Sequence, residues 1–248
     1  MRHLVIVPTY NEADNLGRLI DVLMDISGPT FHLLVVDDGS PDGTAQIAKS
    51  AAHQHPGRIF VLERAGKLGI GTAYVAGFQW AIAQGYDFVY EMDADFSHPP
   101  EALATMAHTL VGGEADLVVG SRYIGGVRVI NWPMRRLILS TCASRYARLV
   151  TGLPILDTTA GFMGYRTSIF SKIRLDRIQA KGYFFQILMK YLVWKLGYRL
   201  KEIPIVFHER RDGQTKLSSG IFWEALVSVL FLPLGYRRYI QNTGHRCS

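Results

Sequence analysis

Two aspartates one residue apart, Asp93 and Asp95, stand in the stretch YEMDADFSHPP at residues 90–100. Carboxylates this close repel each other unless a cation compensates, and Mg²⁺ or Mn²⁺ prefers carboxylate, water and phosphate oxygens as ligands. Two protein carboxylates leave coordination positions open, which suits an ion shared with a diphosphate. The alternative is that both acids favour the N-terminus of a helix that begins near Pro99. We favour the metal, because other polar clusters accompany the pair.

Two of these clusters suit a nucleotide. In VVDDGSPDGT, residues 35–44, a carboxylate such as Asp38 beside a tight turn is placed to accept hydrogen bonds from a base or a ribose. The same stretch fits an ordinary turn in which Asp42 caps the following helix. In GKLGIG, residues 66–71, Lys67 and two of the glycines suit a phosphate, although the GxGxxG spacing of dinucleotide-binding folds is absent.

The elements that must position these residues alternate along the first half of the chain. Short apolar runs predict strands, and the stretches between them predict helices near residues 12–26, 43–54, 71–84 and 99–112. Strands that are apolar throughout and separated by helices indicate an α/β fold: a doubly wound, mostly parallel sheet with helices on both faces. Each polar cluster directly follows a strand, so all of them meet at the edge where such sheets bind ligands.

The second half is less regular, and its most apolar stretch lies near the C-terminus. We expect helices over 134–152 and 182–197, strands within 160–170 and 199–210, and a strongly apolar stretch over 220–240. Residues 221–234 have only Glu224 and Ser228 as polar interruptions and are shorter than the ~20 residues that a membrane span needs. We expect a helix in the membrane interface, with Arg237 and Arg238 near anionic head groups. The alternative is a helix packed into the core.

Charge is divided unevenly along the chain. Residues 1–120 hold 6 Lys and Arg against 15 Asp and Glu, and residues 121–248 hold 21 against 6, so the balances are −9 and +15. A basic half suits an anionic partner such as nucleic acid, an anionic membrane or a phosphorylated substrate. Two distant cysteines, Cys142 and Cys247, predict no disulfide and favour a reducing, cytoplasmic setting. We expect no signal peptide, because LVIVPTYN is typical of a buried strand from residue 4.

Together the motifs resemble the family 2 glycosyltransferases, which have the GT-A nucleotide-diphospho-sugar transferase fold. VIVPTYNE, VVDDGSPDGT, MDADFSHPP and VGSRY carry the resemblance in the first half. In the second half NWPMRRLILS, DTTAGFMGYR, KGYFFQ and EIPIVFHERRDGQTKLS resemble the polyprenyl-phosphate sugar synthases, the dolichyl-phosphate mannose synthases in particular. The resemblance spans residues 3–220. We expect a catalytic domain over 1–219 and a C-terminal interfacial segment over 220–248.

The resemblance implies how the donor is bound. The nucleoside would be held by Pro8, Tyr10, Glu12 and Asp38, with Lys67 nearby. Asp93 and Asp95 would bind Mg²⁺ or Mn²⁺ at the diphosphate, and Ala94 would contact the nucleotide through its backbone. The third metal position is Gln in some relatives and Ser97 here. A hydroxyl is a poorer ligand than an amide oxygen, so a water is expected between Ser97 and the ion.

The resemblance also assigns the basic half to an acceptor, a dolichyl or other polyprenyl phosphate. The acceptor phosphate would be held by Arg122, Arg136 and Ser140. Arg210 and Lys216 would lie on a loop that closes over the donor diphosphate. A phosphate monoester, with a second pKa of about 6, already carries its nucleophilic oxyanion at neutral pH, so transfer needs no general base. Asp157 is the one acid that could serve as a base, and we expect it to fix the DTTAG turn instead.

The implied reaction is a metal-dependent, inverting transfer of mannose from GDP-mannose that gives polyprenyl-phosphate β-mannose and GDP. Its catalytic residues would be Asp95, Arg122, Arg136 and Lys216. The nearest alternative keeps the fold and uses a UDP-sugar donor of glucose or N-acetylhexosamine, because the sequence separates guanine from uracil poorly. A polyprenyl acceptor implies peripheral association with the cytoplasmic face of a membrane, directly or through a separate membrane-anchor subunit.

Two interpretations from other classes of protein fit less well. A nucleic-acid-binding module would use the basic half, but its basic residues are interleaved with apolar helices, and no helix-turn-helix, zinc or RNA-binding pattern is present. A phosphoacceptor domain would use the aspartates of VVDD but leaves the arginines of the second half unexplained. We therefore expect no nucleic-acid partner.

Overall fold

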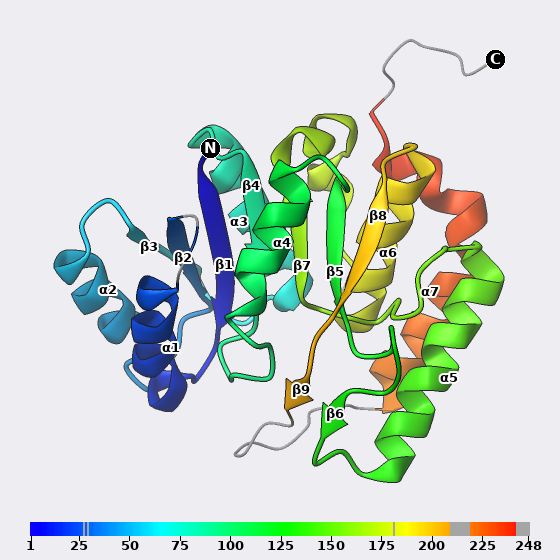
Figure 1. The fold of residues 1–248 in the computed structure, drawn as a ribbon, viewed down its shortest axis with the longest axis horizontal. Coiled ribbons are helices and arrows are strands. Elements are labelled where there is room, and N and C mark those ends of the chain that lie inside the picture. The colour runs from blue at the N-terminus through cyan, green and yellow to red at the C-terminus, as the bar shows by residue number, and fades with distance from the viewer. Residues whose placement is uncertain (27, 29, 181, 209–218, 242–248) are drawn as a thin grey trace.

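A seven-stranded sheet forms the centre of the molecule in the computed structural model (Figure 1). The structure describes residues 1–248 except 27, 29, 181, 209–218 and 242–248, and of 219–224 it describes the backbone alone. The strands of the sheet are β1 (His3–Thr9), β2 (Phe31–Asp37), β3 (Ile59–Glu63), β4 (Phe88–Glu91), β5 (Leu117–Ser121), β7 (Met163–Arg166) and β8 (Leu200–Pro204). Their order is β3-β2-β1-β4-β7-β5-β8, and all are parallel except β7, which runs antiparallel to β4 and β5.

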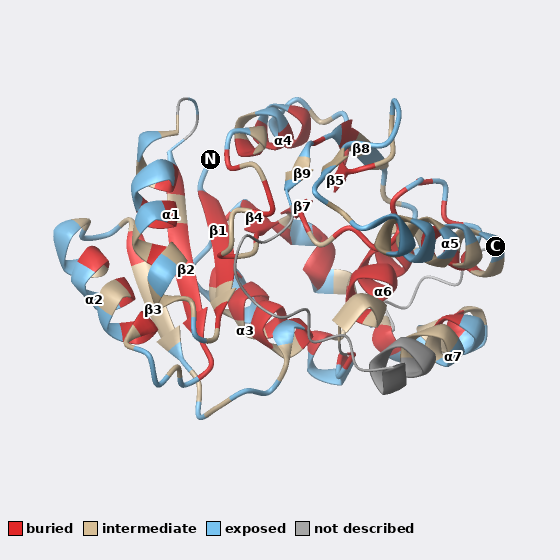
Figure 2. Cartoon of the chain, turned by 90° about the horizontal axis from the view of Figure 1, so that it is seen from below, coloured by how far each residue is buried: buried red, intermediate tan, exposed pale blue. Residues whose placement is uncertain are grey.

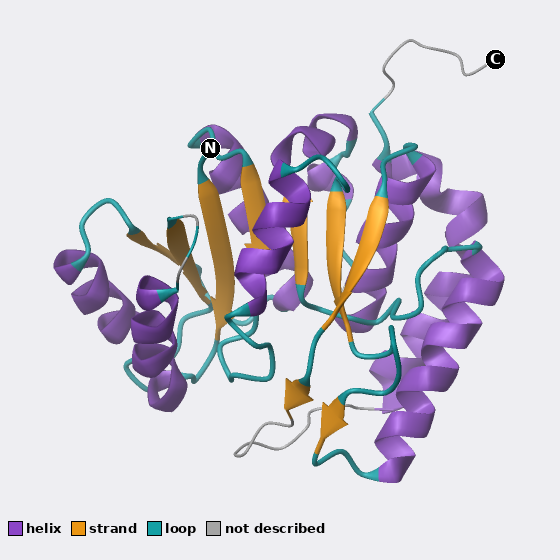
Figure 3. Ribbon diagram, viewed as in Figure 1, coloured by secondary structure: helices purple, strands orange, loops and turns teal. Residues whose placement is uncertain are grey.

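Helices cover both faces of this sheet (Figure 3). The helices are α1 (Ala13–Asp25), α2 (Thr44–Gln54), α3 (Ile70–Ala83), α4 (Ala102–Val111), α5 (Met134–Thr151), α6 (Gly182–Lys195) and α7 (Ser219–Gly235), with 3-10 turns η1 (Thr167–Lys172), η2 (Leu175–Arg177) and η3 (Tyr236–Tyr239). A small parallel pair, β6 (Val129–Ile130) with β9 (Phe207–His208), lies beyond the carboxyl ends of the central strands. The α/β class and the mostly parallel sheet expected from the sequence are confirmed.

The alternation of side chains along β1 explains why both faces need helices. Leu4 and Ile6 pack into a core with α3 and α6, whereas Val5 and Val7 pack into a second core with α1, α2 and α4, and all four side chains are completely buried. A strand that is apolar throughout can satisfy both sets only between two layers of helices. Figure 2 shows these buried strands lying between the helical layers.

The predicted helix at residues 99–112 begins three residues late, at Ala102. Pro99 and Pro100 instead form the turn that precedes it, where their carbonyls accept the N–H groups of Ala102 and Leu103 at 3.1 and 3.0 Å. Proline carries no N–H and fits this turn without losing a hydrogen bond.

The C-terminal helix α7 lies beside α5 and packs against α6, at the end of the sheet beyond β8 (Figures 1 and 2). Val229 and Leu232 are buried in the core. The opposite side leaves exposed Val227, Leu230, Phe231 and Leu234. The alternative of a helix packed into the core is therefore met by one side of α7, and a location of the other side in the membrane interface stays a prediction. In the described part of the chain, no helix is long and apolar enough to cross a membrane. A domain boundary at residue 219 stays a prediction.

Candidate active site

The DAD turn directly follows β4 at the carboxyl edge of the sheet. Phe96 has a φ of 58°, a left-handed conformation that is rare for a bulky residue and typical of functional turns. The Asp95 carboxylate accepts the backbone N–H of Ser97 at 3.0 Å, which holds the turn closed. Ala94 and Ser97 are each 3% exposed, so the turn presents its aspartates to solvent and buries the residues between and beyond them.

Asp93 is held from behind by two buried rings. The hydroxyl of Tyr74 on α3 donates to the Asp93 carboxylate at 3.3 Å, and the backbone N–H of Asp93 donates to Nδ1 of His98 at 3.1 Å. Burial and the nearby carboxylates raise the pKa of Tyr74 well above its ordinary value, so the hydroxyl keeps its proton and remains a donor. His98 stacks on Phe162 with 5.0 Å between ring centroids, which fixes the orientation of the imidazole.

The donor set at this turn fits a hard divalent cation. Asp93 and Asp95 are both partly exposed, and carboxylates are oxygen ligands of the kind that Mg²⁺ and Mn²⁺ prefer. Within the residues described, no three His, Cys, Asp or Glu side chains gather into a metal-binding cluster. The aspartates alone therefore suit an ion that completes its coordination with a diphosphate and water. Direct coordination by Ser97 stays a prediction.

Asp38, expected to bind the nucleoside, is held by an arginine that the sequence analysis did not single out. Arg64 pairs with its carboxylate at 2.6 Å and also donates to Thr72 Oγ1 at 2.9 Å and to the carbonyl of Gly69 at 3.4 Å. The second Asp38 oxygen accepts the N–H of Leu68 at 3.3 Å. Asp38 therefore ties the end of β2 to the segment 64–72, which carries Lys67.

Its neighbour Asp37 has a structural role. The buried carboxylate accepts the hydroxyl of Thr9 at 2.8 Å and both the N–H and the hydroxyl of Ser40 at 2.9 and 2.6 Å. Asp42 forms the expected turn with Thr44, whose N–H it accepts at 3.1 Å. The N–H groups of Asn11 and Ala13 donate to Ser40 Oγ and Asp42 Oδ2, both at 3.0 Å, so the loops after β1 and β2 are held together.

The remaining donor-side residues lie at the end of β1. Pro8 is half-buried and paired with Val36 on β2. The Lys67 ammonium lies 4.5 Å from the centre of the Tyr10 ring, so two of the residues predicted for the nucleoside are in contact. The Glu12 carboxylate accepts the amide of Asn15 at 3.1 Å at the start of α1.

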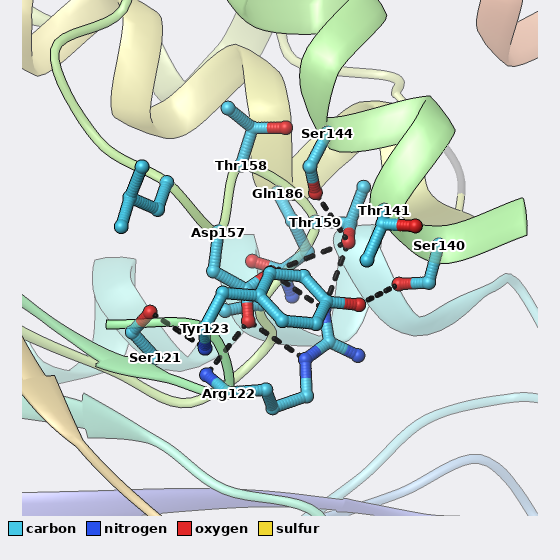
Figure 4. A network of polar contacts seen from close by, with 12 residues as sticks. Ser121, Arg122, Tyr123, Ser140, Thr141, Ser144, Asp157, Thr158, Thr159 and Gln186 are labelled. Atoms are coloured by element: carbon cyan, nitrogen blue, oxygen red, sulfur yellow. Dashed lines mark hydrogen bonds and ion pairs between the residues drawn. The ribbon is translucent and has the colours of Figure 1, made fainter. Parts of the chain in front are cut away.

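Arg122, directly after β5, forms a buried ion pair with Asp157 (Figure 4). Its Nε lies 2.7 Å from Oδ2 and its Nη2 lies 2.6 Å from Oδ1, and Nη2 also donates to Thr159 Oγ1 at 2.8 Å. This bidentate geometry is the strongest that Arg and a carboxylate adopt. The guanidinium also lies against the rings of Trp132 and Phe207, at 5.3 and 5.6 Å.

The other acceptor residues predicted from the sequence gather around Arg122. Arg136 on α5 lies over the Trp132 ring at 4.4 Å, so the two arginines share one aromatic neighbour. Ser140, one helical turn further along α5, accepts the hydroxyl of Tyr123 at 2.7 Å (Figure 4). The structure thus places Arg122, Arg136 and Ser140 in one group. Arg210 and Lys216 lie outside the described residues.

A cavity of about 450 Å³ opens beside this group, between α5, α6 and α7. Its polar lining includes Arg136, Ser140 and Thr159. Its apolar lining includes Leu139, Tyr146, Ile187, Leu226 and Val229. A groove between α5 and α7 shares Leu139, Tyr146 and Leu226 with the cavity and reaches the exposed Leu230. The cavity therefore has charged and polar side chains on the side of Arg136 and apolar side chains beside them.

Two buried charged residues beneath the site were missed. Glu91, two residues before Asp93, accepts the Tyr165 hydroxyl at 2.7 Å, and Lys190 on α6 is 0% exposed. The only signal in the sequence was that each stands within a mostly apolar run, FVYEM and FFQILMKYLVW.

Comparisons with known proteins show which proteins the chain is similar to. The family described as Glycosyl transferase family 2 matches residues 4–174. A polyprenol monophosphomannose synthase of Mycolicibacterium smegmatis is 45% identical over 228 residues, which are 92% of this chain and 85% of that protein. An undecaprenyl-phosphate mannosyltransferase of Micrococcus luteus is 45% identical over 233 residues, 92% of this chain and 93% of that protein.

Solved structures share the fold at low sequence identity. Glucosyl-3-phosphoglycerate synthase of Mycobacterium tuberculosis, in complex with Mn²⁺, UDP-glucose and phosphoglyceric acid, has a TM-score of 0.66 at 18% identity and covers 94% of this chain and 80% of its own. A mannosyltransferase of Pyrobaculum calidifontis, in complex with GDP-Man and Mn²⁺, has a TM-score of 0.56 at 20% identity and covers 95% and 70%. These likenesses confirm the GT-A fold. The family match and the two relatives show that the chain is an enzyme that belongs to glycosyltransferase family 2.

Proposed function

We propose that the protein transfers mannose from GDP-mannose to a polyprenyl phosphate with the help of Mg²⁺ or Mn²⁺. The proposal rests on 45% identity, over nearly the whole chain, to a polyprenol monophosphomannose synthase and an undecaprenyl-phosphate mannosyltransferase. The cavity beside Arg136 supports it, because its polar lining suits a phosphate and its apolar lining suits a prenyl chain. The GDP-Man complex of a mannosyltransferase with the same fold is consistent with the donor.

The donor would bind at the ends of β1, β2 and β4. Asp38 and Arg64 would shape the nucleoside pocket through the segment 64–72, and Tyr10 with Lys67 would form its side. Asp93 and Asp95 would hold the divalent ion, which when bound neutralises negative charge on the donor diphosphate. Tyr74 and His98 would keep Asp93 in place by the hydrogen bonds described above.

The acceptor phosphate would lie against Arg122, Arg136 and Ser140. One of its oxygens would attack the anomeric carbon, the bond from that carbon to the diphosphate oxygen would break, and GDP would leave with the bonding electron pair. A single displacement inverts the configuration, so an α-linked donor gives a β-linked product. With a second pKa of about 6, the acceptor brings its own oxyanion, and the chain needs only to orient it and hold it near the donor.

The polyprenyl acceptor would bring the enzyme to a membrane surface. Exposed apolar side chains on α5 and α7, among them Leu139, Phe231 and Leu234, would contact the bilayer directly or a separate anchor subunit. Arg237 and Arg238, directly after α7, would lie near anionic head groups. We propose peripheral association with the cytoplasmic face.

The test is transfer of radiolabel from GDP-mannose to a short polyprenyl phosphate, with Mg²⁺, with Mn²⁺ and with a chelator. We expect label in the organic phase that requires metal and is lost in Asp95→Asn. Arg136→Gln should raise the KM for the acceptor by roughly tenfold or more, as expected for one lost contact to a charged group. Arg145→Gln, an exposed arginine on the same helix, is the matched control and should leave the KM unchanged.

Other outcomes would overturn parts of the proposal. Transfer from a UDP-sugar, with none from GDP-mannose, would overturn the donor and keep the acceptor. Hydrolysis of the nucleotide sugar without a lipid product would overturn the acceptor. Transfer that survives both the chelator and Asp95→Asn would overturn the role of the metal.

A further inference from the structure

Lys190 on α6 is a completely buried cation beside the candidate active site. Its ammonium donates to the backbone carbonyls of Thr158 at 3.1 Å, Ala160 at 2.6 Å and Gln186 at 3.2 Å. An ammonium has three donors, so every one is used. Gln186 belongs to the same helix, whereas Thr158 and Ala160 belong to residues 157–160, named here the 157–160 loop. Lys190 therefore fastens this loop to α6.

The same loop holds Arg122 from its other side. The carboxylate of Asp157 and the hydroxyl of Thr159 bind the Arg122 guanidinium, while the carbonyls of Thr158 and Ala160 bind Lys190. Alternate residues of the loop thus face two different cations. Figure 4 shows Arg122, Asp157 and Thr159 joined in one network beside α5. Any shift of the loop relative to α6 must move both groups that orient Arg122.

Burying a charge is costly unless it is fully hydrogen-bonded, and an apolar side chain of similar volume would fill this space with less penalty. Here all three N–H groups of the ammonium bond to backbone carbonyls, two of the 157–160 loop and one of α6. A role in packing alone does not account for it.

We propose that Lys190 is a positioning residue for acceptor binding: it fixes the 157–160 loop so that Asp157 and Thr159 hold Arg122 toward the acceptor phosphate. The identity of that acceptor rests on the proposed function, whereas the anchoring of the loop does not. Lys190 itself does not touch the substrates in this scheme and acts through Arg122.

Titration of Lys190 gives the proposal a pH signature. The ionisable groups around the ammonium are Asp157 on the loop, Glu91 on β4, Arg122 after β5 and Glu202 on β8. Burial lowers the pKa of Lys190 to about 7, and the charge of Asp157 only partly opposes this. A neutral amine has fewer donors than an ammonium. The loop should therefore loosen as the pH rises through about 7.

The first experiment compares Lys190→Met with Lys195→Met, the same change at an exposed lysine near the end of the same helix. We expect Lys190→Met to raise the KM for a short polyprenyl phosphate by about tenfold, the effect of one lost contact to a charged group, with the KM for GDP-mannose nearly unchanged. In the wild type the acceptor KM should rise relative to that of Lys190→Met between about pH 6 and pH 8. Equal changes in both KM values, or no change in the acceptor KM, would overturn the proposal.

A double-mutant cycle tests the route through the loop. Thr159→Ala and Lys190→Met should have effects on the acceptor KM that do not add, because both act on the same contact with Arg122. Additive effects would show that Lys190 acts elsewhere. Should Lys190→Met fail to fold, Lys190→Gln takes its place in every comparison, including the pH series, because the acceptor phosphate itself titrates at about pH 6 and its effect cancels only between wild type and variant.

Amide hydrogen exchange separates this proposal from the proposed function, because it needs no substrate. Peptides covering the 157–160 loop should exchange faster in Lys190→Met and at the wild-type rate in Lys195→Met. Faster exchange in a protein that transfers nothing to polyprenyl phosphate would refute the acceptor and leave the anchoring in place. Normal transfer with unchanged exchange and unchanged acceptor KM would refute the role of Lys190.

Discussion

Arg122 and Asp157 form a buried bidentate ion pair that joins the end of β5 to the 157–160 loop, with Nε–Oδ2 and Nη2–Oδ1 distances of 2.7 and 2.6 Å. The backbone N–H of Arg122 donates to the same carboxylate at 3.0 Å. Burial by itself raises the pKa of Asp157, but the charge and hydrogen bonds of Arg122 more than offset this, so the pKa lies below its ordinary value. A carboxylate engaged in this way orients its arginine and is poorly placed to act as a general base.

Asp157→Asn should strongly destabilise the fold. The substitution keeps the shape but leaves the Arg122 guanidinium buried without its counter-charge, which costs about 3–5 kcal/mol of unfolding free energy. Urea unfolding measures this loss. Asp176→Asn is the control, because the Arg174–Asp176 pair is exposed and surface changes stay within about 0.5 kcal/mol. Equal stability of the two variants would show that the buried pair contributes little.

Arg64→Met should weaken donor binding alone. Arg64 joins Asp38 to the segment 64–72, and its loss frees the segment that carries Lys67. We expect the KM for the nucleotide sugar to rise about tenfold, as when one charge-assisted hydrogen bond is lost, with the acceptor KM unchanged. Lys49→Met, in an exposed pair with Glu63 at the end of β3, should change neither KM. A rise in the acceptor KM would contradict the separation of the two sites.

The sequence predicted best what depends on local pattern. Continuous apolar strands and the polar residues directly after them located the sheet and the edge at which these polar residues gather, because both follow from the order of residues along the chain. The structure brings Tyr10 close to Lys67 and Arg122 close to Arg136, whereas their division into donor and acceptor sides stays a prediction.

Contacts between distant segments could not be predicted in the same way. No pattern pairs Asp38 with Arg64, which is 26 residues further on, or places Lys190 against carbonyls 30 and 32 residues before it. These depend on how α3 and α6 pack on the sheet. An apolar helix containing one lysine predicts burial, and only the folded structure shows which groups then satisfy its charge.

Gly71 shows the same difference between motif and packing. The sequence predicted that glycines of GKLGIG contact a phosphate. In the structure Gly71 is closely packed: a Cβ there would overlap the carbonyl oxygen of Ala180 and approach the Phe185 ring to 2.9 Å. Gly71→Ala should therefore push α3 away from α6 and destabilise the protein by roughly 1–3 kcal/mol. Gly66→Ala, where a Cβ meets nothing within 4 Å, is the control and should be near neutral in thermal unfolding. Similar behaviour of both variants would exclude close packing as the reason.

Leu234→Ser should reduce binding to a membrane surface. Leu234 is 81% exposed on the exposed apolar side of α7. If its side chain inserts into the membrane, replacing it removes about 1.5–3 kcal/mol of binding free energy, which lowers membrane partitioning tenfold or more. Co-sedimentation with vesicles of neutral and anionic phospholipid measures the change. Val111→Ser on α4, another exposed apolar residue, should bind as the wild type does. Unchanged binding of Leu234→Ser would favour an anchor protein or no membrane contact at α7.

Glu91→Gln should flatten the dependence of stability on pH. Burial raises the pKa of Glu91 to about 8, although hydrogen bonds from Tyr165 and Gln186 and the charge of Lys190 favour ionisation. The unfolded chain ionises near the ordinary value of 4.5, so between the two values the folded state holds the extra proton. Stability from this group is thus present below pH 4.5 and falls as pH rises toward 8, by up to ~1.4 kcal/mol per unit.

The measurement is the free energy of unfolding in urea for the wild type and Glu91→Gln, with chelator, between about pH 5 and pH 6. In this range, below its pKa of about 7, Lys190 is charged in both states, and the buried histidines titrate alike in both proteins. Their effects cancel in the difference, which isolates Glu91. The glutamine keeps an oxygen to accept the Tyr165 hydroxyl and cannot ionise. The free energy of unfolding of the variant should therefore rise relative to that of the wild type as the pH rises. Parallel curves would mean that Glu91 is ionised in the folded protein, with Lys190 as its counter-charge.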